Sequence, residues 1–328
     1  MKISRYGRSV AIVWMLALLA GCGGAPPAPT QPGTSALAGA AAQAAGHGRS
    51  WIKPGAASGD LLYIGGSSES WIFSYPDGEY VGGIAAGSSG TCSDNSGNVY
   101  LTRTSNVTEY AHGGTSPIAS FSVPGTATAC SFDPTTGNLA VVVSCFASCG
   151  QEVAVFSGPT KPPVTFEDPG LSILYCGYDN AGNLFVDGEA AGKFGFAELP
   201  SGGSTLANVA IDLSVTNPGQ VQWDGQYVTV EERFHPAVYQ ISVSGSTATV
   251  VNTVKFNEIG LKAGQSWIDG GTIVIPYAPG RKRPKNVRFW NYPAGGNATK
   301  TLRDFILRHM SVNGVTVSSL PSQHKESR

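Results

Sequence analysis

The sequence predicts an all-β fold in which one four-stranded unit is repeated around a ring. Of its 328 residues, 43 are Gly and 21 are Pro, and only 13% are charged, a composition typical of a chain with many tight turns. No long segment has the 3.6-residue hydrophobic period of a helix. A short motif, Asp followed by a Gly-containing turn and an apolar run, recurs along the chain. Together these observations indicate strands joined by hairpins.

The motif is clearest at 179–186, which reads Asp-Asn-Ala-Gly-Asn-Leu-Phe-Val. Gly, Asn and Asp tolerate the positive φ of tight hairpin turns, so each copy is expected to form a strand, a turn and a strand. Successive copies begin 34, 39, 46, 45 and 45 residues apart. Their first residues are Asp60, Asp94, Asp133, Asp179, Asp224 and Asp269.

A second turn follows each copy of the motif. It has the form Tyr-Pro-x-Gly at 75–78 and at 292–295, and apolar runs flank it on both sides. Two hairpins in each period give four strands, and four-stranded repeats of about 40–45 residues are typical of propeller blades. The copies therefore predict a six-bladed β-propeller of four-stranded antiparallel blades over residues 50–319.

The first unit is incomplete, because it has only three candidate strands, at 61–65, 70–75 and 80–84. The segment 313–318 is a candidate strand that has no hairpin partner after it. We therefore expect the C-terminal strand to join the N-terminal blade as its innermost strand, which closes the ring and removes the edges of an open sheet. An open or seven-bladed array is the alternative. Residues 320–328 are expected to be a disordered tail.

Residues 1–21 have the features of a bacterial export signal. Three basic residues lie ahead of an apolar run at 10–20 that is too short to span a bilayer. The run ends in Leu-Ala-Gly-Cys, which resembles the lipobox of bacterial lipoproteins. The resemblance implies that residues 1–21 are removed and that Cys22 carries fatty acyl chains such as palmitate, which hold the protein to a membrane. The alternative is an ordinary secretory signal with an incidental Cys.

Residues 22–49 are rich in Ala, Gly and Pro and are expected to form a disordered tether. Without residues 1–21 the chain has 18 basic residues (21 minus 3) against 22 acidic ones, a formal charge of −4, which argues against a nucleic-acid partner. We expect a monomer that is lipid-anchored in the bacterial cell envelope. By resemblance to enterobacterial sorting, Gly23 favours the outer membrane or cell surface over the inner membrane.

Two segments carry a family resemblance: 176–188, which contains the clearest motif, and 292–296, Tyr-Pro-Ala-Gly-Gly. On these residues the chain resembles NHL-like and gluconolactonase-like six-bladed propellers over roughly 58–319. It looks closest to a group of bacterial secreted and lipoprotein repeat proteins. The resemblance implies the architecture but no single function, since propellers host lactonases, lyases and binding scaffolds.

A gluconolactonase-like enzyme holds a divalent cation at the channel mouth with Glu, Asn and Asp oxygens. This chain departs from that pattern, because no set of converging carboxylates stands at the innermost-strand positions before the repeated Asp residues. No His cluster, Gly-x-Ser-x-Gly elbow or full calcium loop is present either. We therefore expect no catalytic set, no metal and no cofactor. The innermost-strand residues are Cys92, Cys130, Cys176, Gln222 and Ser266.

Candidate binding residues lie in the connections on the ring face opposite the repeated Asp turns. These connections vary, whereas the Asp turns are short and uniform, so the variable-loop face is the expected binding face. The charged residues there form either the rim of a ligand site across neighbouring blades or solvated loops whose charges pair weakly. They are Asp187, Glu189, Glu231, Glu232, Arg233, His235, Arg281 and Arg283.

Five Cys residues follow the lipobox. Cys145 and Cys149 lie in one loop, where an exported location permits a disulfide between them. Cys92, Cys130 and Cys176 are expected to be buried thiols between blades. The reason is that facing sheets pack about 10 Å apart, whereas a disulfide needs Cα atoms within about 7 Å.

The sequence favours a membrane-tethered, non-catalytic scaffold that binds an envelope protein, a peptide or a glycan through the variable-loop face. One alternative is a gluconolactonase-like metal-dependent hydrolase or lyase at the channel mouth, and another is a purely structural envelope protein. Recurrent aromatic residues, among them Trp223 and Trp267, are expected to pack between blades rather than to form a carbohydrate-stacking platform.

Overall fold

The computed structural model describes residues 49–144, 151–234, 237–257, 264–277, 286–302 and 311–320. These residues belong to one compact unit, Ala45–Arg328. Over the described ranges the secondary structure consists of strands and one short 3-10 helix, Ala56–Ser58. The predictions made for six residues fall outside these ranges; they concern Cys22, Cys145, Cys149, His235, Arg281 and Arg283.

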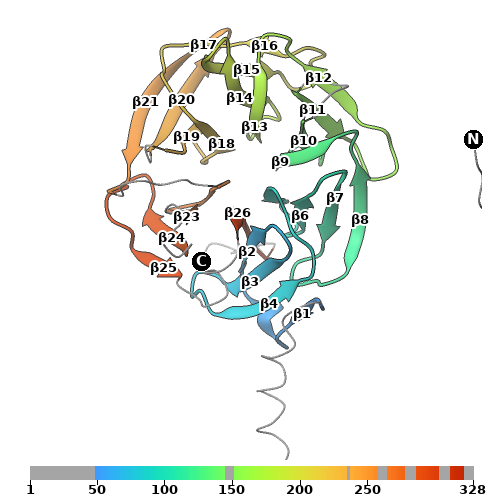
Figure 1. Ribbon diagram of the computed structural model, residues 1–328. Coiled ribbons are helices and arrows are strands. Elements are labelled where there is room, and N and C mark those ends of the chain that lie inside the picture. Colours follow the sequence, from blue (N-terminus) through green and yellow to red (C-terminus); the bar gives the residue numbers. More distant parts are fainter. Residues whose placement is uncertain are drawn as a thin grey trace, which may run out of the picture. The chain divides into compact units, whose positions relative to one another are not determined.

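Six sheets stand around a central axis as the blades of a β-propeller (Figure 1). The first blade contains, from the axis outwards, β26 (Val312–Ser318), β2 (Leu61–Gly66), β3 (Ser70–Ser74), β4 (Tyr80–Ile84) and β1 (Trp51–Ile52). The second contains β5 (Thr91–Ser93), β6 (Val99–Thr102), β7 (Asn106–Tyr110) and β8 (Pro117–Ser122). The third contains β9 (Thr126–Phe132), β10 (Leu139–Ser144), β11 (Gln151–Phe156) and β12 (Val164–Glu167). The all-β fold and the six blades predicted from the repeat are confirmed.

The other three blades follow in the same inner-to-outer order. The fourth contains β13 (Ser172–Tyr178), β14 (Leu184–Ala190), β15 (Lys193–Leu199) and β16 (Ala207–Asn208). The fifth contains β18 (Pro218–Trp223), β19 (Val228–Glu232), β20 (Ala237–Ser244), β21 (Thr247–Lys255) and β17 (Ala210–Ile211). The sixth contains β22 (Trp267–Asp269), β23 (Thr272–Tyr277), β24 (Asn286–Asn291) and β25 (Lys300–Leu302). The first and fifth blades thus have a short fifth strand at the outer edge, β1 and β17, which the repeat did not predict.

The repeated Asp side chain holds its own hairpin turn. In the fourth blade, Oδ1 of Asp179 accepts hydrogen bonds from the backbone N–H groups of Ala181 and Asn183, both at 2.9 Å. Oδ2 of Asp179 accepts one from the Asn183 side chain at 2.8 Å. Gly182 has a φ of 81°, which favours Gly. The motif is therefore a turn that satisfies its own polar groups, as its sequence predicts.

The C-terminal strand closes the ring. β26 pairs antiparallel with β2, with Val317 opposite Leu62 and Val315 opposite Ile64. It also meets the sixth blade, because the backbone N–H of Val315 donates to the carbonyl of Gln265 at 2.9 Å. The predicted closure of the N-terminal blade by the C-terminal strand is confirmed.

Apolar side chains fill the six interfaces between neighbouring blades. Between the sixth and first blades, for example, Trp71, Phe289 and Val315 are buried together. Alternate residues of a strand point to opposite faces of the sheet, so each sheet contributes to two interfaces. The core is consequently divided among the blade interfaces. Residues around the central axis do not have to fill a common core and can therefore vary from blade to blade.

One disulfide joins the second and third blades, between Cys92 on β5 and Cys130 on β9. The prediction that both are free thiols is wrong. The Cα atoms of the pair lie 5.7 Å apart, because the innermost strands of neighbouring blades converge towards the axis and approach more closely than the 10 Å of facing sheets. The thiol of Cys176 is free and buried, as predicted, and its burial raises its pKa.

We expect the disulfide to stabilise the ring substantially. Its two Cys are 38 residues apart, and a loop of this length corresponds to about 3–4 kcal/mol of unfolded-state entropy. Replacing both, C92A with C130A, should lower the urea midpoint, and a reducing agent should lower that of the wild-type protein to a similar value. The double variant should not respond further to the reducing agent. If neither the double substitution nor the reducing agent changes the midpoint, the expected stabilisation by the disulfide is wrong.

Candidate functional site

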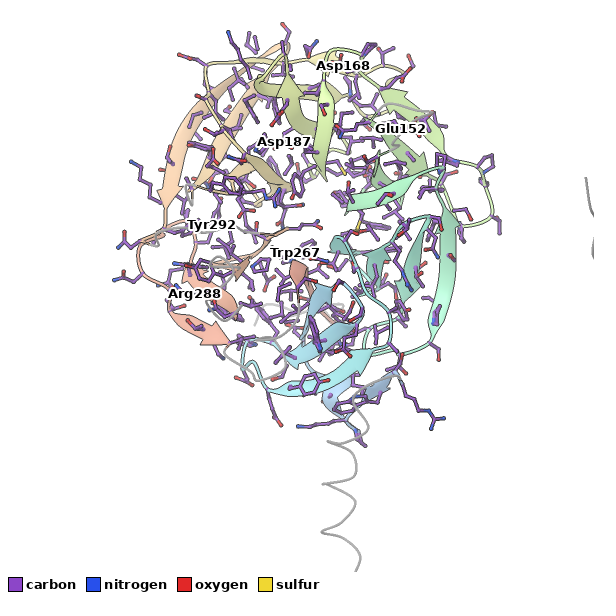
Figure 2. All side chains as sticks on the ribbon, viewed as in Figure 1. Glu152, Asp168, Asp187, Trp267, Arg288 and Tyr292 are labelled. Carbon is purple, nitrogen blue, oxygen red and sulfur yellow. A yellow bond between two sulfur atoms is a disulfide. The ribbon has the colours of Figure 1, made fainter. Side chains whose placement is uncertain are left out.

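The acids predicted to lie in loops of the variable-loop face lie in strands instead. Asp187 is on β14 and Glu231 is on β19, the second strands of the fourth and fifth blades. Asp187, Glu231 and Glu232 are 0%, 3% and 3% exposed, so the prediction of solvated loops is wrong for these three. Figure 2 labels Asp187 on the inner part of the fourth blade.

Asp187 is a buried carboxyl group without a hydrogen-bond partner of normal geometry on either oxygen. Burial raises its pKa well above the usual range, and the charge of Glu231 raises it further. The backbone N–H of Tyr175 and the charge of Arg233 act in the opposite direction, without overcoming burial. A buried carboxyl of this kind is costly when ionised.

Glu231 points towards the sixth blade, where its Oε2 accepts a hydrogen bond from the Ser266 hydroxyl at 2.7 Å. Burial raises the pKa of Glu231 to about 7, although Ser266 and Arg233 favour the ionised form. The Arg233 guanidinium lies 5.8 Å from the centre of the Tyr175 ring. Asp187, Glu231, Arg233 and Tyr175 therefore form one cluster, here called the buried acid cluster.

Of the other predicted residues that the structure describes, Glu189 and Glu232 have separate environments. Glu232 accepts hydrogen bonds from the backbone N–H groups of Thr216 at 2.7 Å and of Asn217 and Phe234, each at 3.2 Å, so it orders the adjoining loops. Glu189 is exposed and lines a small hollow of about 330 Å³ between the third and fourth blades.

The opposite face, which carries the Asp turns, has an open pocket at the mouth of the central channel, here called the mouth pocket. Its volume is about 590 Å³, within the range of small-molecule sites. It is lined by the ends of the innermost strands of four blades. The lining residues are Ser93, Asp94, Asn95, Trp223, Asp224, Gly225, Trp267, Ile268, Asp269, Gly270, Val317, Ser319 and Leu320.

Two half-buried indoles form much of the apolar wall of the mouth pocket, Trp223 and Trp267. Figure 2 labels Trp267 at the middle of the ring. Trp267 packs against the core between the sixth and first blades and also against the core between the second and third blades, so its ring lies across the channel. The prediction that these indoles pack between blades is incomplete, because both also face a pocket.

Three carboxylates surround the indoles: Asp94, Asp224 and Asp269. Partial burial raises the pKa of Asp224, but hydrogen bonds from Tyr292, Gln240 and its own turn outweigh burial, and the pKa is lowered overall. The Tyr292 hydroxyl donates to Asp224 at 2.6 Å, which connects the sixth and fifth blades. No Lys, Arg or His stands among the described residues of the lining.

A further hollow of about 510 Å³ lies on the outer part of the same face, between the fourth and fifth blades. Its lining includes Phe185, Trp223 and Ile241, with Asp179 and Glu198. Trp223 thus borders both this hollow and the mouth pocket. The mouth pocket and this hollow therefore lie on the same face of the ring, the Asp-turn face.

Across the described ranges, no three His, Cys, Asp or Glu side chains gather in a way that could hold a metal ion. His112 has a structural environment, since its ring nitrogens lie 2.6 Å from the Ser318 hydroxyl and 3.1 Å from the Gly59 carbonyl oxygen. Among the same residues, no helix has the length and apolar character needed to cross a bilayer.

Comparison with known proteins supports the fold alone. No protein-family model and no curated protein matches the chain. A crystal structure of a protein of unknown function from Bacteroides caccae is similar, with a TM-score of 0.60, 16% identity and coverage of 79% of this chain and 99% of that one. The β-propeller domain of Cps50 (Swd1) from Myceliophteria thermophila has a TM-score of 0.56 and 8% identity, covering 84% of this chain and 91% of that domain. The chain is a six-bladed β-propeller.

Proposed function

We propose that this protein is a lipid-anchored scaffold of the bacterial cell envelope that binds its partner, without chemical turnover, at the mouth pocket. The observation that carries the proposal is the mouth pocket itself, with two indoles and three carboxylates around a ligand-sized hollow. Pockets with aromatic walls and a few placed polar groups are typical ligand sites. The proposal places binding on the Asp-turn face rather than on the variable-loop face.

Two features support an envelope location. The lipobox-like segment ends at Cys22, whose acyl chains would hold the protein to a membrane without a spanning helix. The disulfide between Cys92 and Cys130 suits an oxidising compartment outside the cytosol. Residues 22–49 would then act as the tether between membrane and propeller.

The scaffold role is tested by chemical cross-linking in intact envelopes, with the full-length protein and two matched variants. Trp223→Ala removes one wall of the mouth pocket, whereas Val164→Ala truncates a side chain that is 61% exposed on the outer strand β12. We expect cross-linked adducts in the wild-type protein and in Val164→Ala, and their loss in Trp223→Ala. Adducts that persist in Trp223→Ala would overturn binding at the mouth pocket.

The tether is tested with Cys22→Ala. The wild-type protein should sediment with membranes, and Cys22→Ala should move to the soluble fraction or remain an uncleaved precursor, because the acyl chains are lost. Sedimentation of mature Cys22→Ala in the same amount as the wild type would contradict the anchor.

A second candidate function is a gluconolactonase-like hydrolase or lyase, and the buried acid cluster is the observation that favours it. Two carboxyl groups with raised pKa values on adjacent blades are a recognised sign of acid–base chemistry. The test is hydrolysis of a set of sugar lactones, with and without added calcium. Turnover that is lost in both Asp187→Asn and Glu231→Gln, but not in Glu189→Gln, would favour the enzyme over the scaffold.

A further inference from the structure

The mouth pocket combines aromatic walls with charge of one sign. Trp223 and Trp267 are half-buried and line the hollow, so part of each indole is exposed to the pocket. The aromatic surface is therefore available to a ligand.

Two of the three carboxylates of the pocket, Asp94 and Asp224, are fixed in place by their own turns. Oδ1 of Asp94 accepts hydrogen bonds from the backbone N–H groups of Ser96 and Asn98, both at 2.8 Å. Oδ2 of Asp94 accepts hydrogen bonds from the Asn98 side chain at 2.9 Å and the Tyr100 hydroxyl at 3.1 Å. Asp224 is held in the same manner by Gln226 and Tyr227. All of these donors are neutral, so the negative charges are oriented but not cancelled.

A concave site lined by charge of one sign attracts the opposite charge. The described lining supplies three carboxylates and no cationic side chain. An ammonium group, in addition, is attracted to the face of a Trp ring, and quaternary ammonium ligands are bound in aromatic cages on this principle. A neutral sugar can stack on the indoles and donate hydroxyl hydrogen bonds to the carboxylates, but it brings no positive charge to balance theirs, so the net negative charge of the lining favours a cation.

We propose that the mouth pocket binds an organic cation, with its ammonium group between the Trp223 and Trp267 indoles and facing the Asp94 and Asp269 carboxylates. This inference rests on the proposed function, because it names the class of ligand for the same pocket. The ammonium group can belong to a small amine of the choline type or to a lysine side chain of a peptide.

The test uses choline as the probe and 3,3-dimethylbutan-1-ol, its neutral carbon analogue, as the matched control ligand. Tryptophan fluorescence of the full-length protein should change saturably with choline. The analogue should bind about tenfold more weakly, a difference of about 1.4 kcal/mol, because it lacks the cation–π contact. Raising the salt concentration should weaken choline binding only. Titration with Nα-acetyl-lysine amide distinguishes a peptide source from a small amine.

Two pairs of variants locate the site. Trp223→Leu removes one aromatic face, and Trp51→Leu, on the edge strand β1, is its control. Asp269→Asn removes one charge of the lining at constant shape, and Asp212→Asn, at an exposed position in another connection, is its control. We expect Trp223→Leu and Asp269→Asn each to weaken choline binding about tenfold and the two controls to leave it unchanged.

The outcomes separate this inference from the scaffold role. Three results would each contradict the proposal that the mouth pocket binds an organic cation. They are the absence of saturable choline binding, equal affinity for choline and its neutral analogue, and choline binding that Trp223→Leu does not weaken. If Trp223→Ala loses its envelope adducts but choline does not bind, the scaffold role is supported and the proposal of an organic cation is rejected. Binding of a neutral disaccharide that depends on Trp223 would point to a glycan and would also reject the cation.

Discussion

A chain that ends at Ser311 is expected not to fold. It lacks β26, the innermost strand of the first blade, and with it the buried side chains of Val312, Val315 and Val317. Burying a Val contributes about 1.5–3 kcal/mol, so the three together contribute about 5–9 kcal/mol. This is comparable with the whole stability of a domain, about 5–15 kcal/mol. Loss of β26 also leaves the edge of β2 unpaired.

The matched control is a chain that ends at Leu320, which keeps β26 complete. Circular dichroism during heating should show a cooperative transition for the chain ending at Leu320, close to that of the full chain, and no cooperative transition for the chain ending at Ser311. If both truncated chains unfold at the same temperature as the full chain, ring closure by the C-terminal strand makes no contribution to stability.

The second large effect is a decrease in stability as pH rises. Glu231 has a pKa of about 7 in the folded protein, against an ordinary value of 4.5. Between pH 4.5 and 7 the folded state holds a proton that the unfolded state has lost, so the free energy of unfolding falls as pH rises through this window. The loss amounts to about 3 kcal/mol at most. Asp187, whose pKa is also raised by burial, acts in the same direction.

Urea unfolding at pH 5 and pH 8 tests this dependence. Glu231→Gln should be more stable than the wild type at pH 8 and should lose less stability between the two pH values, because the buried charge is absent. Asp187→Asn should behave in the same way. Glu189→Gln, at an exposed neighbouring position, should follow the wild type. A wild-type protein that becomes more stable from pH 5 to pH 8 would reject the buried acid cluster.

The blades were predictable because their signals are local. An Asp that accepts hydrogen bonds within its own turn, followed by a Gly with positive φ, needs no tertiary contact to favour a hairpin. Counting these turns gives six units, and the strand missing from the first unit, together with the unpaired segment at 313–318, predicts how the ring closes. The short outer strands β1 and β17 carry no such signal, since each has only two residues.

The site was harder to predict because it depends on where strands converge. The Cys92–Cys130 disulfide forms where innermost strands approach the axis, a distance that the general spacing of packed sheets overestimates. Asp187 and Glu231 are charged and were therefore placed in loops, yet strands β14 and β19 continue through them. The spacing of the motif does contain one usable signal, because both residues occupy the fourth position of the strand that follows the Asp turn.

The mouth pocket illustrates the same limit. Its indoles come from the fifth and sixth blades, and its carboxylates come from the second, fifth and sixth. No sequence window contains this set, and the regular position of Trp267 in the repeat suggests only packing. That Trp267 contacts two separate cores and lies across the channel becomes evident only when the ring is closed.

Site-specific photo-cross-linking in living cells tests the choice of face most directly. A photoreactive residue at the exposed Asn95 reports on the mouth pocket, and one at the exposed Glu189 reports on the variable-loop face. Binding at the mouth pocket predicts a discrete adduct from position 95 that Trp223→Ala abolishes, and none from position 189. A discrete adduct from position 189 alone would contradict the account and return the binding site to the variable-loop face.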